Sequence, residues 1–169
     1  IKSPGNTVTL DENANNEKAQ TLTQTVRIGV VSGSLDGIPG KIVVGLMGSI
    51  RRLQLGPDVK LELIAMCFPT PRDSTTDRAA VVFDRHINLI ALNKTQTIER
   101  ILDAKADFIL FADAALDSRV FALAHERLAV WQANLWGFGG TLGIKTIDFF
   151  VMPEPLLAAA TCPKQSLIS

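Results

Sequence analysis

The chain has 169 residues, of which 47% are hydrophobic and 20% charged, and this composition suits one globular domain with a substantial core. Seventeen basic residues balance seventeen acidic ones, so the charge predicts neither a nucleic-acid partner nor an anionic membrane surface as partner. No run of about 18 apolar residues occurs, so the sequence predicts no bilayer-spanning segment.

The N-terminal residues 1–25 are rich in Asn, Thr, Glu, Gln and Lys and lack a sustained apolar period. They predict a linker or flexible arm. A β-branched apolar run at 26–32 predicts the first strand. Pro39 then suits a first helical turn, and apolar residues recur at helical spacing up to Leu53. The first structured unit is therefore predicted as strand, loop and helix.

The next part of the chain predicts a second strand at 59–67 and a polar, proline-containing surface loop that runs to Asp77. Residues 79–86 fit a helix or irregular chain equally well. A short third strand is predicted at 87–92.

Two helix starts follow in the sequence. Asn93 with Gln96 three residues later predicts a capping box, and Asp117 predicts a second helix cap. Between them, residues 107–111 predict a fourth strand that is covered on both faces. Phe121, Ala124 and Leu128 are expected to share the apolar face of the second helix.

An apolar run at 131–136 predicts a buried strand, with Trp131 and Trp136 both in the core by default. A glycine-rich loop at 137–143 follows, and it lets a ligand approach main-chain N–H groups closely. A tight connection without a ligand fits this loop about equally well. The candidate substrate-binding residues in it are Gly139, Gly140 and Thr141.

Strands that alternate with helices at these intervals predict an α/β fold, a Rossmann-like parallel sheet with helices on both faces. Ligands of such sheets bind outside the carboxyl ends of the strands. The loops at 32–39, 113–117 and 137–143 should therefore converge on one edge, and this convergence predicts a site there.

The carboxylates at that edge are candidates for acid–base or binding roles. We expect Asp113 to be catalytic and Asp36 to bind substrate, whereas Asp117 is better explained as a helix cap and Asp36 also fits a plain turn residue. Neither His86 nor His125 has partners at metal-ligand spacing, so no metal is expected.

The two cysteines, Cys67 and Cys162, also lack metal-ligand spacing. A buried, inert Cys67 is favoured over a disulfide between them, which indicates a reducing, cytoplasmic compartment.

Two segments also carry a family resemblance. Residues 127–150 read RLAVWQANLWGFGGTLGIKTIDFF and resemble the R-L-A-P-x-Q … W-G-x-P-x-T-x-G … x-x-D-Y segment of O-linked N-acetylglucosamine transferases, glycosyltransferase family 41. Residues 27–32, RIGVVS, resemble the R-I-G-Y-V-S strand that opens the catalytic region of that family. Residues 112–117, ADAALD, resemble the P-D-I-G-M-D of bacterial and plant-like members.

The resemblance implies the N-terminal lobe of a two-lobed GT-B glycosyltransferase at 26–153, with 154–169 as a connection towards a missing C-terminal lobe. It implies transfer of N-acetylglucosamine or a similar sugar from a UDP-sugar, as substrate rather than cofactor, to Ser or Thr of an acceptor protein. Tetratricopeptide repeats commonly precede this region in the family. The chain is then expected to be a fragment that is inactive alone.

The chain departs from the family pattern at its first loop, where Ile38 stands in place of a histidine before Pro39. The alternative is therefore a non-catalytic binding or scaffold relative that kept the fold. A third possibility is an unrelated flavodoxin-like or receiver domain, although residues 32–34 supply none of the acidic residues that a receiver needs.

Overall fold

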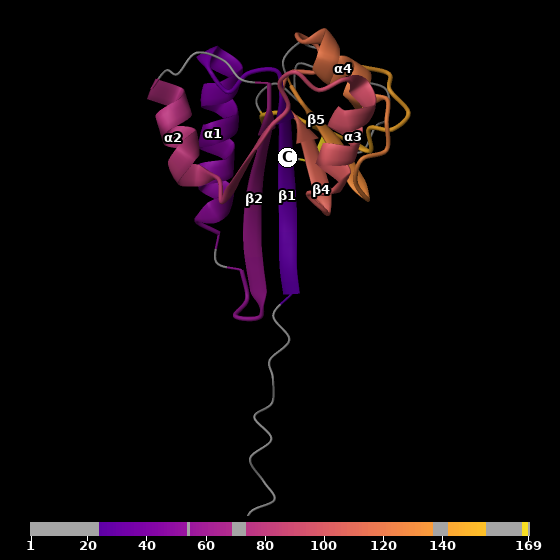
Figure 1. Ribbon diagram of the computed structural model, residues 1–169. Coiled ribbons are helices and arrows are strands. Elements are labelled where there is room, and N and C mark those ends of the chain that lie inside the picture. The colour runs from indigo at the N-terminus through magenta and orange to yellow at the C-terminus, as the bar shows by residue number, and fades with distance from the viewer. Residues whose placement is uncertain (1–23, 54, 69–73, 137–141, 155–166, 169) are drawn as a thin grey trace, which may run out of the picture.

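The computed structural model describes residues 24–53, 55–68, 74–136, 142–154 and 167–168 (Figure 1). Within them, seven parallel strands form one sheet in the order β3-β2-β1-β4-β5-β6-β7. The strands are β1 (Gln24–Ser32), β2 (Val59–Cys67), β3 (Arg85–Asn88), β4 (Phe108–Phe111), β5 (Trp131–Leu135), β6 (Phe149–Val151) and β7 (Leu167–Ile168). The helices are α1 (Gly37–Arg51), α2 (Ser74–Val82), α3 (Lys94–Leu102) and α4 (Ser118–Ala124).

This strand order is that of a Rossmann-like sheet, so the predicted α/β class is confirmed. The chain builds β1, β2 and β3 in one direction from the middle and then returns to place β4 on the other side of β1. The order therefore reverses between β1 and β4. A crevice at the carboxyl ends of these two strands is where such sheets bind ligands.

Helices cover both faces of the sheet (Figure 1): α1 and α2 lie on one side and α3 and α4 on the other. Alternate residues of each strand enter the two cores, because successive side chains of a strand point to opposite faces. On β2, Leu63 and Ala65 pack towards α1 and α2, whereas Ile64 and Met66 belong to the other core. Each central strand is thus buried on both faces, as predicted for the fourth strand.

The first helix ends earlier than its apolar pattern predicted. Arg51 is its last residue, and Leu53 lies outside it with 61% of its surface exposed. The prediction that Leu53 shares the apolar face is wrong, because the chain turns after Ile50, whose carbonyl accepts the N–H of Leu53. Pro39 does lie in the first helical turn.

The region between β2 and α3 was predicted least well. Residues 74–77, assigned to a surface loop, begin α2, and β3 starts two residues before the predicted third strand and ends at Asn88. The Asn88 side chain accepts the N–H of Ile90, and Ala91 has a φ of 58°, so the chain turns before Leu92. A short helix and a four-residue strand each contain too few apolar repeats for the sequence pattern to tell one from the other.

The predicted capping box at Asn93 is confirmed, since its side chain accepts the Gln96 N–H and the Gln96 side chain accepts that of Asn93. The prediction of a buried Trp131 is wrong: it is 52% exposed, at the first position of β5, where it contacts the ring of Phe149. Phe121 is likewise exposed rather than part of the core face of α4.

Candidate functional site

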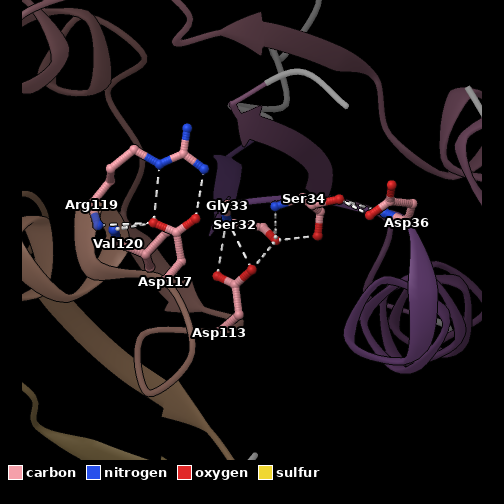
Figure 2. Close-up of polar contacts among 8 residues, drawn as sticks. All are labelled: Ser32, Gly33, Ser34, Asp36, Asp113, Asp117, Arg119 and Val120. Carbon is pink, nitrogen blue, oxygen red and sulfur yellow. Dashed lines mark hydrogen bonds and ion pairs between the residues drawn. The ribbon is translucent and has the colours of Figure 1, made fainter. Parts of the chain in front are cut away.

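Asp113 links the two strands at the point where the strand order reverses (Figure 2). It follows β4, and both of its carboxylate oxygens lie 3.0 Å from the backbone nitrogen of Gly33, which follows β1. The Ser32 hydroxyl lies 2.9 Å from Asp113 Oδ2 and 2.7 Å from the Ser34 carbonyl oxygen, and it can donate to one of them at a time. Asp113 therefore fixes the loop that follows β1, at the carboxyl ends of the two strands.

Burial makes Asp113 harder to ionise than an exposed carboxyl. The side chain is only 8% exposed, and this burial raises its pKa, although the hydrogen bonds from Gly33 and Ser32 oppose the shift. The neighbouring Cys67 thiol is free, and burial together with the negative charge of Asp113 raises its pKa to about 12. The raised pKa agrees with the predicted inert thiol, although Cys67 is partly rather than fully buried, and Cys162 lies outside the described residues.

Asp117 caps α4, as predicted: its Oδ1 accepts the backbone N–H groups of Arg119 and Val120. The guanidinium of Arg119 also binds both carboxylate oxygens, at 3.1 and 2.6 Å, and this hydrogen bonding lowers the pKa of Asp117 (Figure 2). The negative charge of Asp117 is thereby balanced by Arg119, in the first turn of the same helix. Asp117 is a structural cap beside the crevice.

Gly33 must be a glycine because Asp117 approaches it closely. A Cβ atom at Gly33 would lie 2.1 Å from Asp117 Oδ2, well inside van der Waals contact. The sequence predicted the loops but not the residues that bond to their carboxylates: Ser32 and Gly33, which bond to Asp113, and Arg119, which bonds to Asp117. The signal was the Ser-Gly-Ser that directly follows the first strand.

Asp36 lies at the other end of the same loop, at the start of α1. Its carboxylate makes no bond to the helix N–H groups and instead accepts the hydroxyl of Ser34. The backbone N–H of Asp36 donates to that same Ser34 oxygen, at 3.1 Å. Asp36 is partly exposed, so it is more accessible to a ligand than Asp113.

Of the third predicted loop and its surroundings, the structure describes only the flanking residues. Gly139, Gly140 and Thr141 lie outside the described residues. Before them, Asn134 near the end of β5 is 3% exposed, and its Oδ1 is the one buried side-chain oxygen or nitrogen without a hydrogen-bond partner in the described part of the chain. After them, Gly143 has a φ of 63°, a conformation that favours glycine.

The motif residues that carried the family resemblance form a structural network beside this loop. Gln132 is fully buried, and its Oε1 accepts the N–H groups of Leu128 and Ala129. Its Nε2 donates to the carbonyl oxygens of Glu126 and Thr146. All of the hydrogen-bonding groups of this amide are thus used to join the turn after α4 to the turn before β6.

A pocket of about 310 Å³ lies beside the crevice, on the side of α3 and α4. Phe68 and Leu92 supply apolar walls, and Thr97 and Ser118 supply hydroxyl groups. The guanidinium of Arg119 lies 4.2 Å from the centre of the Phe68 ring. The carboxyl edge therefore offers a largely apolar pocket next to the Asp113 loop.

Neither histidine lies on the loops at 32–39 or 113–117. His86 is the second residue of β3 and is in register with Ala65 of β2, and His125 directly follows α4, the helix that returns the chain from the carboxyl edge to the start of β5. Each packs edge-on against a phenylalanine ring, His86 on Phe83 and His125 on Phe121. Among the described side chains, no group of three His, Cys, Asp or Glu could hold a metal ion.

Across the described residues, no helix combines the length and apolar character needed to cross a membrane.

No protein-family model matches the chain, and no curated protein shows significant similarity to it. Solved structures do match, among them a mutant O-GlcNAc transferase of Thermobaculum terrenum, with a TM-score of 0.63 and 24% sequence identity. The match covers 76% of this chain and 24% of that one, so the chain spans about a quarter of the length of this transferase. At this level of identity the likeness establishes a shared fold.

Proposed function

We propose that the chain is the N-terminal lobe of the catalytic region of a glycosyltransferase related to family 41, which transfers N-acetylglucosamine or a similar sugar from a UDP-sugar to Ser or Thr of a protein. The observation that carries the proposal is the reversal of strand order between β1 and β4, in a sheet whose fold is similar to that of a transferase; sheets of this kind bind ligands at the carboxyl ends of such strands. The motifs at 27–32 and 127–150 occur in the family's order along the chain.

The residues at the crevice divide into two roles under this proposal. Asp36 and the glycine loop with Gly139, Gly140 and Thr141 contact substrate under this proposal, because Asp36 lies on the loop after β1 and the glycine loop follows β5 in the sequence, and loops that follow parallel strands form the binding edge. Asp113 is the acid–base candidate, since burial moves its pKa towards the range that general base catalysis requires. The diphosphate is bound by a C-terminal lobe that completes the cleft, and no metal takes part.

The test measures sugar transfer by the polypeptide as its gene encodes it. This 169-residue chain is incubated in parallel for comparison. Each is mixed with UDP-N-acetylglucosamine and an unstructured Ser- and Thr-rich polypeptide, and intact mass spectrometry follows the acceptor. A sugar-sized mass increase with the encoded polypeptide and none with this chain alone supports the proposal. Nucleotide binding without transfer contradicts it.

A second candidate function is a binding or scaffold relative that has lost catalysis. Two observations favour it: Ile38 occupies the position of the family's loop histidine, and neither histidine of the chain lies on the loops at 32–39 or 113–117. Transfer that is lost in Asp36→Ala but kept in the distant His125→Gln variant would exclude this alternative. Asp36 is the better probe because it makes fewer structural hydrogen bonds than Asp113.

A further inference from the structure

The outer surfaces of α1 and α2 enclose a groove of about 540 Å³, on the face of the sheet away from α3 and α4. Its uncharged lining, called its floor below, includes Val44, Gly45 and Gly48 of α1 and Val82 of α2. Val81 stands at its edge with 82% of its surface exposed. The groove thus combines adjacent apolar side chains, Val44, Val81 and Val82, with charged residues around them, and such an arrangement marks interaction sites.

The groove is held open by a contact at one end. The Arg51 side chain donates to the Val82 carbonyl oxygen at 2.9 Å and to the Asp84 carboxylate at 2.7 Å, which ties the last turn of α1 to the end of α2. A larger residue in place of Gly45 would fit without a steric clash, since a Cβ there meets no atom within 4 Å. The groove is therefore a preformed surface feature with free space above its floor.

The rim of the groove is positively charged. Lys41, Arg52 and Arg78 line it, and none of them lies within salt-bridge distance of a described carboxylate. Arg51 and Arg85 nearby do pair with acidic residues, whereas the groove lining contains these three cations and no acidic residue. The chain has no net charge, so this concentration does not come from a generally basic composition.

We propose that the groove docks an acidic amphipathic helix of a partner protein. Lys41 lies in α1 and Arg52 directly follows its last residue, eleven residues later, with its side chain folded back towards Gly48 and Ser49. A partner helix lying along α1 carries carboxylates on successive turns, so it can contact both cations at once. Its apolar side chains fill the strip between the cations and cover Val81, as in other helix-in-groove complexes.

The test uses a fluorescein-labelled, 16-residue helical peptide with Leu along one face and Glu in the two flanking rows. A matched peptide carries Lys in place of every Glu. Fluorescence anisotropy should show binding of the Glu peptide alone. The double variant Arg52→Glu with Arg78→Glu should weaken this binding by about tenfold or more, because two attractive charge pairs become repulsive.

Two further variants separate docking from general effects. Gly45→Gln places a side chain over the floor without changing the rim charge, and binding should again fall by about tenfold as the apolar contacts are lost. Lys145→Glu changes an exposed cation outside the groove and should alter binding by less than about twofold. Circular dichroism and urea unfolding confirm that each variant is folded.

Equal binding of the two peptides, no binding of either, or unchanged binding by the double variant would overturn the proposal. Binding to phosphatidylglycerol vesicles without binding to the Glu peptide would overturn it as well, since the surface would then recognise an anionic membrane. The experiment uses no sugar nucleotide, so its outcome is independent of the proposed transferase activity.

Discussion

The Asp148 carboxylate binds the guanidinium of Arg127 through two hydrogen bonds, of 2.6 and 3.1 Å. The same carboxylate accepts the backbone N–H of the fully buried Gln132, at 2.8 Å. Three residues of the motif that resembles a glycosyltransferase segment are therefore engaged in holding β5 against the turn before β6. These hydrogen bonds and this ion pair stabilise the fold, so the fold requires the three residues whether or not the chain catalyses transfer.

Replacing Asp148 by Ala should destabilise the chain by about 1–3 kcal/mol, because the Gln132 N–H loses its acceptor in a buried position. Arg127→Ala is the matched control, since it removes only the partly exposed ion pair and should cost about 1 kcal/mol or less. Urea unfolding followed by circular dichroism measures both. Equal losses for the two variants would mean that the ion pair, not the buried amide, is the important contact.

Gly33→Ala should also destabilise the chain, by about 1–3 kcal/mol, because the new methyl group collides with the Asp117 carboxylate. Gly45→Ala tests the opposite situation in the middle of α1, where a Cβ meets no neighbour. It should stabilise by about 0.5–1 kcal/mol through helix propensity and a less flexible unfolded chain. Thermal unfolding midpoints that move in the same direction would contradict this account of the two glycines.

Asn93→Ala should cost about 1 kcal/mol, since both hydrogen bonds of the capping box at α3 depend on the first-turn geometry that this side chain fixes. Thr95 is an exposed residue of the same turn, and Thr95→Ala serves as the control. The control should leave stability unchanged within about 0.5 kcal/mol. A loss in the control as large as that of Asn93→Ala would show that the first turn, rather than the cap, is sensitive.

The fold could be predicted from the sequence because its signals are local. β2 occupies the predicted residues 59–67, and the caps at Asn93 and Asp117 lie where their side chains and spacing indicated. The site could be predicted only as a set of loops, because parallel topology brings the ends of β1 and β4 together without saying which atoms meet.

What the sequence could not supply were contacts between residues far apart in the chain. The bond from Gly33 to Asp113 spans 80 residues, and the burial that raises the Asp113 pKa comes from the packing of several elements. Residues 74–77 were misassigned for a related reason, since a polar helix start next to prolines looks like a loop. Tertiary packing overrides such local patterns.

Asp113→Asn should reveal the buried carboxyl through the pH dependence of stability. Because burial raises the folded-state pKa above the ordinary 3.8, ionising Asp113 costs the folded state free energy. Below pH 3.8 the carboxyl is protonated in both folded and unfolded states, and this cost is absent. It grows as the pH rises from 3.8 through the raised pKa, and it is constant above it.

Asparagine cannot ionise, so the free energy of unfolding of the original chain minus that of Asp113→Asn should fall as the pH rises from about 4 to 7. Hydrogen bonds lost to Gly33 or Ser32 shift this difference by a nearly constant amount. The pKa values of Asp117 and Asp148 are lowered, but both proteins contain these residues, so the contribution of their titration largely cancels in the difference. Urea unfolding at a series of pH values measures the difference. A difference that rises with pH would mean that the hydrogen bonds from Gly33 and Ser32 outweigh burial, and Asp113 would then be an ionised structural anchor rather than an acid–base candidate.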